Sequence, residues 1–451
     1  MKKILTILII LLLAPSFVLA DGMIIPPINP QVPLDENAQI AAINYQDGLE
    51  KMIISVNFDM KDYDKAAWVF PVPAEPEKVV IDIISTFPNF YGQDVVQKAK
   101  SDIDNLVLVS SLTQIYPLFL FLPFSYRLSA TTTGMAEMGK GIGGTVEGIT
   151  VYEHIEKGGI STDIVTSRTP EALYSYLQRK GINAPVGSLP VFDYYIGKDY
   201  TFVVSYITRG GVMGYEYGYM ESYPYRRQPG IFITFPTDRI YYPLIPSSVY
   251  GSKTIPVRIY LIGHMTPDLY SDISSYSKTD YYIQNYVSVG DLANFFGNIN
   301  TNDVKFTKVE INVPSKYFYQ DLWFNDVAPR KVNYAMGVYG SISKHPFIFG
   351  IIFILIVSTI TGAITGLLLF KDFKKFALLG LFNIFTIIGV AIAIAFTRTK
   401  KLDETLKRNL KKEGFVAITI DKRKFYFVLL FSVLFLIVAF LVGYIIKLPL
   451  M

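Results

Sequence analysis

The sequence contains no cysteine. This absence excludes disulfide bonds, thiolate metal sites, cysteine nucleophiles and thiol redox chemistry. Histidine is nearly absent too: His154, His264 and His345 lie far apart in the sequence, without the short spacing of a zinc site. The sequence also has no Asn-x-Ser/Thr acceptor for N-glycosylation. We therefore expect neither a metal nor a cofactor.

Three long apolar runs, at residues 346–370, 376–397 and 425–446, contain no Asp, Glu, Lys or Arg. Each is about as long as the 20 helical residues that cross a hydrocarbon core of about 30 Å. The sequence therefore predicts C-terminal transmembrane helices, with membrane lipids as partners. Ionisable residues inside the membrane usually mark ion paths and proton relays, so their absence argues against a pump or an ion-coupled transporter.

Small residues in the first run predict helix packing. Gly362 and Gly366 are four residues apart, a spacing that lets two helix backbones approach closely. Such a close contact joins either two helices of one chain or helices of different chains in an oligomer. Alternatively, these are glycines scattered as in any membrane helix.

The basic segments between the runs conflict with a simple topology. Residues 398–424 hold ten basic and four acidic residues, and the positive-inside rule places such a loop in the cytoplasm. If the preceding domain is outside and both earlier runs cross the membrane, this loop emerges outside. Either residues 376–397 are re-entrant or the rule is broken, and the sequence leaves both alternatives open.

The N-terminus has the pattern of a secretory signal. Met1-Lys2-Lys3 precedes an apolar run. Residues 1–20 then end in Val18-Leu19-Ala20, a small-residue exit that is typical of a signal-peptide cleavage site. Residues 21–345 are then an exported domain at the cell membrane, on its extracytoplasmic side. Acidic residues outnumber basic ones in this domain, although the whole chain has a net charge of +4. The positive charge therefore reflects membrane topology, and nucleic acid is not an expected partner.

The exported domain has the patterns of an α+β fold with a mainly antiparallel sheet and a few packed helices. Residues 39–46 and 49–60 flank an Asp47-Gly48 turn, which predicts a hairpin. Thr169 and Pro170 begin a predicted helix that ends before Gly181. Residues 92–106 also have a helical apolar stripe, and the Gly/Thr-rich residues 129–144 look like a mobile loop.

Five segments of this domain carry a family resemblance. They are Trp68-Val69-Phe70-Pro71-Val72-Pro73, the predicted 149–166 hairpin, the 170–181 helix, Tyr194-Tyr195 followed by Phe202-Val203-Val204, and Ile233-Thr234-Phe235 through Tyr242-Pro243-Leu244. In this order they resemble the exported proteins of the domain-of-unknown-function 2330 family, over most of residues 39–263. The Trp68 segment is the most specific part. The resemblance implies a fold and an exported setting, and it supplies no activity.

A glycine-rich stretch interleaved with tyrosine is the predicted binding site. Its tyrosines are Tyr215, Tyr217, Tyr219, Tyr223 and Tyr225. Tyrosine on a glycine-rich loop is typical of recognition surfaces, although the same residues could cover a sheet as a β-hairpin. We expect a membrane-anchored extracytoplasmic binding or envelope-structural protein whose partner is another envelope protein or a glycan. The alternative is an exported hydrolase whose polar groups converge only in three dimensions.

Overall fold

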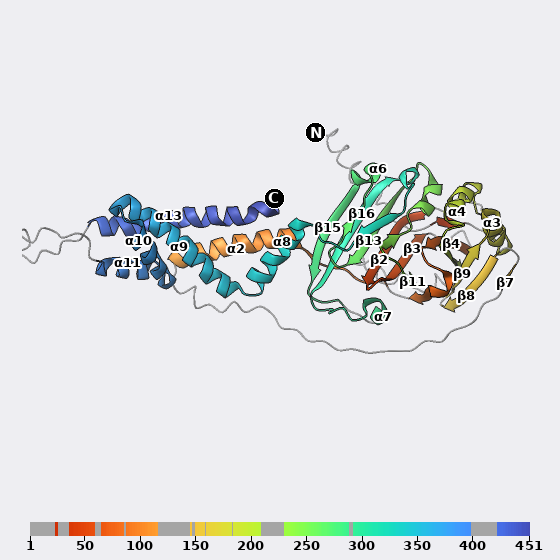
Figure 1. The fold of residues 1–451 in the computed structure, drawn as a ribbon, viewed down its shortest axis with the longest axis horizontal. Helices are drawn as coiled ribbons and strands as arrows, with labels where there is room; N and C mark the ends of the chain where they lie inside the picture. Colours follow the sequence, from red (N-terminus) through yellow and green to blue (C-terminus); the bar gives the residue numbers. More distant parts are fainter. Residues whose placement is uncertain are drawn as a thin grey trace, which may run out of the picture. The chain divides into compact units, whose positions relative to one another are not determined.

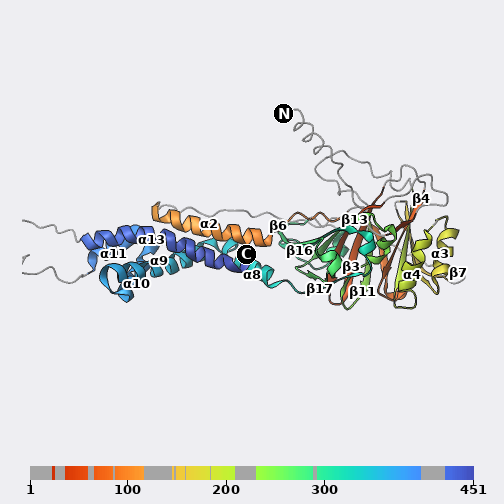
Figure 2. The ribbon, with the colours of Figure 1, turned by 90° about the horizontal axis from the view of Figure 1, so that it is seen from above.

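The computed structural model describes residues 23–25, 36–58, 65–84, 87–115, 145–146, 149–157, 159–182, 184–208, 230–287, 292–397 and 422–451. The chain forms two compact units. We call the first, within residues 1–94 and 131–329, the sheet unit, and the second, within residues 95–130 and 330–451, the helical unit. Figures 1 and 2 show the elements of each. In the described chain, the backbone passes between the units at Asp94–Val95 and at Pro329–Arg330.

The sheet unit contains a six-stranded antiparallel sheet. Its strands, in spatial order, are β1 (Met23–Ile25), β4 (Lys65–Val72), β10 (Thr201–Thr208), β9 (Ile160–Ser167), β8 (Ile149–Lys157) and β7 (Thr145–Val146). β4 and β10 pair over their full lengths, with Thr201 opposite Val72 and Thr208 opposite Lys65. The sheet therefore joins segments far apart in the sequence.

An eight-stranded sheet forms the second layer. In spatial order it contains β5 (Val80–Ile84), β11 (Gly230–Pro236), β3 (Leu49–Phe58), β2 (Glu36–Gln46), β13 (Thr254–Ile262), β16 (Val304–Pro314), β15 (Ser277–Gln284) and β6 (Gln93–Asp94). A small third sheet contains β12 (Ile240–Tyr242), β17 (Leu322–Asn325) and β14 (Thr266–Pro267). Apart from the parallel β2–β13 pair, the described strand pairs are antiparallel. The predicted α+β class is confirmed.

The β2–β3 hairpin shows how local sequence sets the register. Asp47 and Gly48 have φ angles of 53° and 77°, as a two-residue type I′ turn requires. Gln46 therefore pairs with Leu49, and the register continues to Ile40 and Ser55. This places Ile43, Met52 and Ile54 on one buried face. The Asp47-Gly48 turn predicted from the sequence is confirmed.

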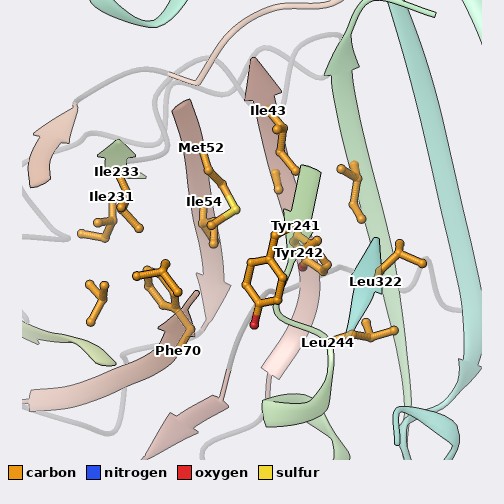
Figure 3. Close-up of a cluster of buried hydrophobic side chains, with 14 of the residues drawn as sticks. Ile43, Met52, Ile54, Phe70, Ile231, Ile233, Tyr241, Tyr242, Leu244 and Leu322 are labelled. Carbon is orange, nitrogen blue, oxygen red and sulfur yellow. The ribbon is translucent and has the colours of Figure 1, made fainter. Parts of the chain in front are cut away.

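The main core lies between the two large sheets (Figure 3). Phe70 comes from the six-stranded sheet, and Met52 and Ile233 come from the eight-stranded sheet. Burying each such side chain contributes roughly 1.5–3 kcal/mol. Tyr241 and Leu322 of the small sheet close the same cluster, so the three sheets share one core.

Two helices cover the outer face of the six-stranded sheet. α3 (Pro170–Arg179) begins where the Thr169 hydroxyl accepts a hydrogen bond from the Ala172 backbone N–H at 3.1 Å. Its buried residues pack with those of α4 (Leu189–Tyr195) against the strands. The predicted cap and helix are confirmed, whereas α4 was not predicted.

The helical unit holds the apolar segments. Its elements are α2 (Val95–Ile115), α8 (Arg330–Val338), the π-helical turn η7 (Tyr339–Ser343), α9 (Pro346–Phe370), α10 (Phe373–Gly380), the 3₁₀ turn η8 (Leu381–Phe385), α11 (Thr386–Phe396), α13 (Lys422–Lys447) and the 3₁₀ turn η9 (Leu448–Leu450). In the described part of the chain, residues 346–370, 373–396 and 422–450 are long and apolar enough to cross a membrane. The protein is therefore membrane-associated.

The position of α2 differs from the expected domain boundaries. The sequence placed the 92–106 helix and residues 330–345 in an exported domain ending at residue 345. The structure extends the helix to Ile115 and groups both segments with the C-terminal helices. A Cβ atom added at Gly443 of α13 would contact Val107 and lie 3.9 Å from Ile103. The apolar stripe of α2 was recognised in the sequence, but periodicity does not identify what covers a stripe.

α9 and α13 run antiparallel (Figures 1 and 2). At one end, the Phe427 ring of α13 lies 5.1 Å from the Phe376 ring, which stacks on Phe370 at the end of α9. At the other end, the Tyr334 hydroxyl of α8 donates to the Ile446 carbonyl at 2.8 Å. α13 therefore returns along α9 toward α8.

The segment between α9 and α13 first turns back along α9. A Cβ atom added at Gly366 would lie 2.7 Å from the Asp372 carbonyl oxygen, and one added at Gly362 would lie 3.2 Å from the Gly380 Cα atom. Farther along, the Asn383 side-chain amide donates to the Ser358 hydroxyl at 2.8 Å. α10 thus packs antiparallel on the second half of α9.

A second turn sends α11 back again. Thr386 has a φ angle of 65°, so the backbone breaks direction there. Gly389 of α11 then packs on Phe382 and Phe385 of η8. The Lys424 ammonium donates to the Thr397 carbonyl at 2.8 Å, so α11 ends beside the start of α13. α10, η8 and α11 form a helical hairpin that begins and ends at the same end of the bundle.

The glycine contacts give a stability prediction. Replacing Gly366 with Leu should destabilise the protein by about 1–3 kcal/mol, because the new side chain would overlap the Phe376 side chain and the Asp372 carbonyl. Thermal unfolding of the full-length chain in detergent would measure the change. Gly337→Leu on α8 is the control, since Gly337 is exposed and a Cβ atom there meets no atom within 4 Å. Equal unfolding temperatures for both variants would contradict a close α9–α10 seam.

Candidate functional site

The structure describes some of the residues that the sequence predicted as sites and leaves others out. Tyr215, Tyr217, Tyr219, Tyr223 and Tyr225 lie outside the described residues. Gly362 and Gly366 lie at the α9–α10 contact described above, so their neighbours are in the same chain. Within the described residues, no group of three or more His, Asp or Glu side chains could hold a metal ion.

A polar cluster lies around Asp163 of β9, at the margin of α3. Its carboxylate is buried, and Oδ1 lies 2.5 Å from Nδ1 of His154 on β8. Oδ2 accepts from the Tyr176 hydroxyl at 2.5 Å and from the Lys180 ammonium at 3.1 Å. The Lys180 ammonium also lies 5.0 Å from the centre of the Tyr206 ring. The antiparallel pairing of β8 and β9 places His154 directly opposite Asp163.

The electrostatics of this cluster keep Asp163 ionised. Burial alone would raise the pKa of Asp163, but hydrogen bonds from Tyr176 and His154 and the charge of Lys180 outweigh it and lower the pKa below its usual value. Burial and the bond to Asp163 raise the pKa of the Tyr176 phenol. The carboxylate therefore stays charged and fixes the orientation of His154.

The His154–Asp163 pair has part of the arrangement of a general base. A carboxylate that orients a histidine through one ring nitrogen leaves the other nitrogen for proton transfer. The His154 side chain is 45% exposed, so solvent reaches it. In the described part of the chain, however, its polar contact is Asp163, and no hydroxyl nucleophile is hydrogen-bonded to it. The pair alone does not form an active site.

A second buried carboxylate connects three segments of the sheet unit. Asp321 accepts hydrogen bonds from the hydroxyls of Tyr195 and Tyr241 at 2.9 Å. It also accepts from the backbone N–H groups of Leu244 and Ile245, at 2.9 and 3.0 Å. Burial raises the pKa of Asp321 to about 6, although these hydrogen bonds act in the opposite direction. All four donors are neutral, so they satisfy the oxygen atoms without supplying a positive charge.

Glu50 of β3 is fully buried in the same core region. Its Oε2 atom accepts from the Tyr241 backbone N–H at 2.7 Å, whereas Oε1 has no hydrogen-bond partner among the described residues. Burial raises the pKa of Glu50 well above its usual value. Burial therefore favours the protonated form of Glu50, and the side chain belongs to the core.

A cleft of about 350 Å³ lies between α2 and α9 in the helical unit. Figures 1 and 2 both show α2 alongside these helices. The inner wall is apolar and includes Leu106, Val109, Ile351 and Ile354. Gly350 also lines the cleft, and a Cβ atom there would meet no atom within 4 Å. The absent side chain leaves this space open.

Polar side chains of α2 line the same cleft. At its outer end, the Lys98 ammonium is paired with Asp102 and donates to the Ser343 hydroxyl at 3.1 Å, and Ser343 in turn donates to Asp102. Farther in, Ser110 is buried, and its hydroxyl has no hydrogen-bond partner among the described residues. Asn105 lies between these positions. These polar positions recur at helical spacing in the sequence, beside the apolar stripe of α2.

The helical hairpin has a second cleft, of about 590 Å³, between α10 and α11. Its lining is apolar except near Lys375 and Thr397, and it includes Leu378, Phe382 and Ile392. Phe396 and Leu378 are largely exposed, as expected for side chains that face lipid.

The fold and the apolar helices together define a membrane-associated α+β protein. A comparison of the chain with models of known families, with curated proteins and with solved structures found no match.

The buried carboxylates give a pH prediction. With a pKa near 3.9 when unfolded and about 6 when folded, Asp321 binds its proton more tightly in the folded state. Its contribution to the free energy of unfolding should therefore fall as pH rises from about 4 to about 6, by about 3 kcal/mol in total. In Asp321→Asn this fall should disappear. Asp163, whose pKa is lowered, contributes the opposite slope at acidic pH in both proteins.

Thermal unfolding of the full-length protein between pH 4 and pH 7.5 measures this difference. Asp193→Asn is the control, because Asp193 lies exposed on α4. We expect the stability difference between Asp321→Asn and the wild type to change with pH, and the Asp193→Asn difference to stay constant. Parallel pH profiles for all three proteins would show that Asp321 does not titrate in this range.

Proposed function

We propose that this chain is a membrane-anchored extracytoplasmic binding protein, in which α9 and α13 cross the membrane and hold the sheet unit outside the cytoplasm. The observation that carries the proposal is the fold-back of the α10–α11 hairpin. Because the hairpin starts and finishes at one end of the bundle, α9 and α13 are the two full crossings. The segment 373–396 is then re-entrant, which is one of the two alternatives that the sequence left open.

The charge distribution supports this topology. Lys371, Lys374 and Lys375 follow α9, and Lys422–Lys424 begin α13. With a re-entrant hairpin, all of these residues lie at the same end of the bundle. The positive-inside rule then assigns that end to the cytoplasm without an exception.

The opposite end of the bundle supports an exported sheet unit. The Lys331 ammonium of α8 donates to the Met451 carbonyl at 3.1 Å, and Lys447 pairs with Asp104 of α2. The two described connections to the sheet unit, before Val95 and before Arg330, therefore leave the bundle near the end of α13. The signal pattern of residues 1–20 and the resemblance to an exported family favour the same side.

We favour binding over catalysis because the sheet unit offers no assembled active site among its described residues. Asp321 and Glu50 are enclosed in the core, and the tyrosine-rich stretch around Tyr217 remains our proposed recognition surface. A hydrolase is the second candidate, favoured by the His154–Asp163 pair. Activity-based probes that label serine hydrolases distinguish the two: labelling of the wild type that is lost in His154→Ala would favour the hydrolase, and no labelling would favour binding.

The lack of cysteine permits a direct topology test. Single cysteines replace Lys374 and Lys422 at the proposed cytoplasmic end, and Tyr276 and Val327, which are exposed on the sheet unit. In intact cells, a membrane-impermeant maleimide should label only Tyr276→Cys and Val327→Cys. After permeabilisation, all four should react. Labelling of Lys422→Cys in intact cells would mean that residues 373–396 cross the membrane fully.

A further inference from the structure

We propose that the cleft between α2 and α9 binds a zwitterionic phospholipid of the extracytoplasmic leaflet. This inference rests on the proposed function, because the cleft reaches that leaflet only with the topology given above. It names the ligand class of a site in the helical unit, separate from the tyrosine-rich stretch.

The depth of the cleft indicates a ligand that comes from the membrane. Its α9 wall spans Pro346 to Ile354, the first turns of a helix that is apolar throughout. Its α2 wall runs from Lys98 to Thr113, and from Asn105 onward the described part of α2 carries no charged residue. The cleft therefore extends from the level where charged side chains end into the level of the hydrocarbon. Its volume of about 350 Å³ is within the range of small-molecule sites.

The polarity of the cleft matches an amphiphile. Lys98, Asp102 and Ser343 form a hydrogen-bonded group at the outer end, whereas Leu106, Val109 and Ile351 form the inner wall. A phospholipid has the same order, with a polar head above an apolar chain. Ser110 and Thr113 are the polar exceptions inside. The Thr113 hydroxyl donates to the Ser110 backbone carbonyl at 2.6 Å, whereas the buried Ser110 hydroxyl has no partner among the described residues. It can donate to an ester carbonyl of the lipid, and a buried hydroxyl otherwise costs free energy.

The outer group indicates a head that carries both charges. The Lys98 ammonium has three N–H donors, of which two point to Asp102 and Ser343. The Asp102 carboxylate accepts from both of these neighbours and retains acceptor capacity. A phosphate can accept from the Lys98 ammonium, which also lies 5.8 Å from the centre of the Tyr339 ring, while an ammonium group of the lipid donates to Asp102. An anionic head without an amine would place its charge beside the Asp102 carboxylate, so a zwitterionic head fits better.

The test uses the full-length protein in nanodiscs that contain a photoreactive phosphatidylethanolamine. After illumination, mass spectrometry locates the labelled peptides. Labelling should concentrate on α2 and on the first turns of α9. Gly350→Leu places a side chain in the cleft, at a position where a Cβ atom meets no atom within 4 Å, and it should lower this labelling at least tenfold. Gly337→Leu is the matched control outside the cleft and should label like the wild type.

Two further arms separate the possible outcomes. Photoreactive phosphatidylglycerol at the same density should label α2 several-fold less than phosphatidylethanolamine, and Asp102→Asn should remove that difference. Equal labelling by both lipids would overturn the head-group assignment. Labelling that is spread evenly along α9 and α13, or that survives Gly350→Leu, would show only surrounding lipid and overturn the site. The cysteine topology experiment uses no lipid probe, so failure of the topology and failure of the lipid site are distinguishable.

Discussion

The return of the chain between Gly380 and Thr386 is the constraint on which the helical unit depends. A backbone that turns inside a hydrocarbon layer must satisfy its polar groups within the protein, because no water is available there. Here the Asn383 side-chain N–H donates to Ser358, whereas its Oδ1 atom has no partner among the described residues. The glycines of α9 let the α10 backbone lie close enough for that bond. If this turn is inside the membrane, both basic segments face one side and the charge conflict disappears. Length and composition mark three helices as able to cross a membrane, and the contacts fold the second of them into a hairpin.

The sheet unit shows how neighbours decide the state of a buried carboxylate. Asp163, Asp321 and Glu50 are all buried, yet the pKa of Asp163 is lowered and the other two are raised. Asp163 has the Lys180 cation beside it, whereas the donors to Asp321 and Glu50 are phenols and backbone amides. Neutral donors replace the hydrogen bonds that a carboxylate loses when it leaves water, but they replace only part of the stabilisation that water gives to its negative charge. The contribution of Asp163 to stability therefore changes with pH in the opposite direction to those of Asp321 and Glu50. Asp163 also contacts a partly exposed side chain, that of His154.

Local features of the sequence predicted local structure well. The Asp47-Gly48 turn and the Thr169 cap are decided by two to four neighbouring residues, and both were confirmed. The partner of α2 was not predictable in this way, because its apolar stripe would suit a sheet or a helix equally. The donors to Asp321 come from residues 195, 241, 244 and 245. Such a site forms only when the whole sheet unit folds, so sequence spacing gave no sign of it.

The glycines of α9 show why the α2–α9 cleft was also hidden in the sequence. Gly350, Gly362 and Gly366 have the same side chain and the same helical setting. At Gly362 and Gly366 the vacated space is filled by α10, whereas at Gly350 it stays open. A glycine on a membrane helix thus permits either close packing or a cavity, and the neighbouring helix decides which. Here the hairpin covers the second half of α9 and leaves the first half to α2. The polar face of α2 fills that half incompletely, so one helix carries both a close helix–helix contact and a cleft of about 350 Å³.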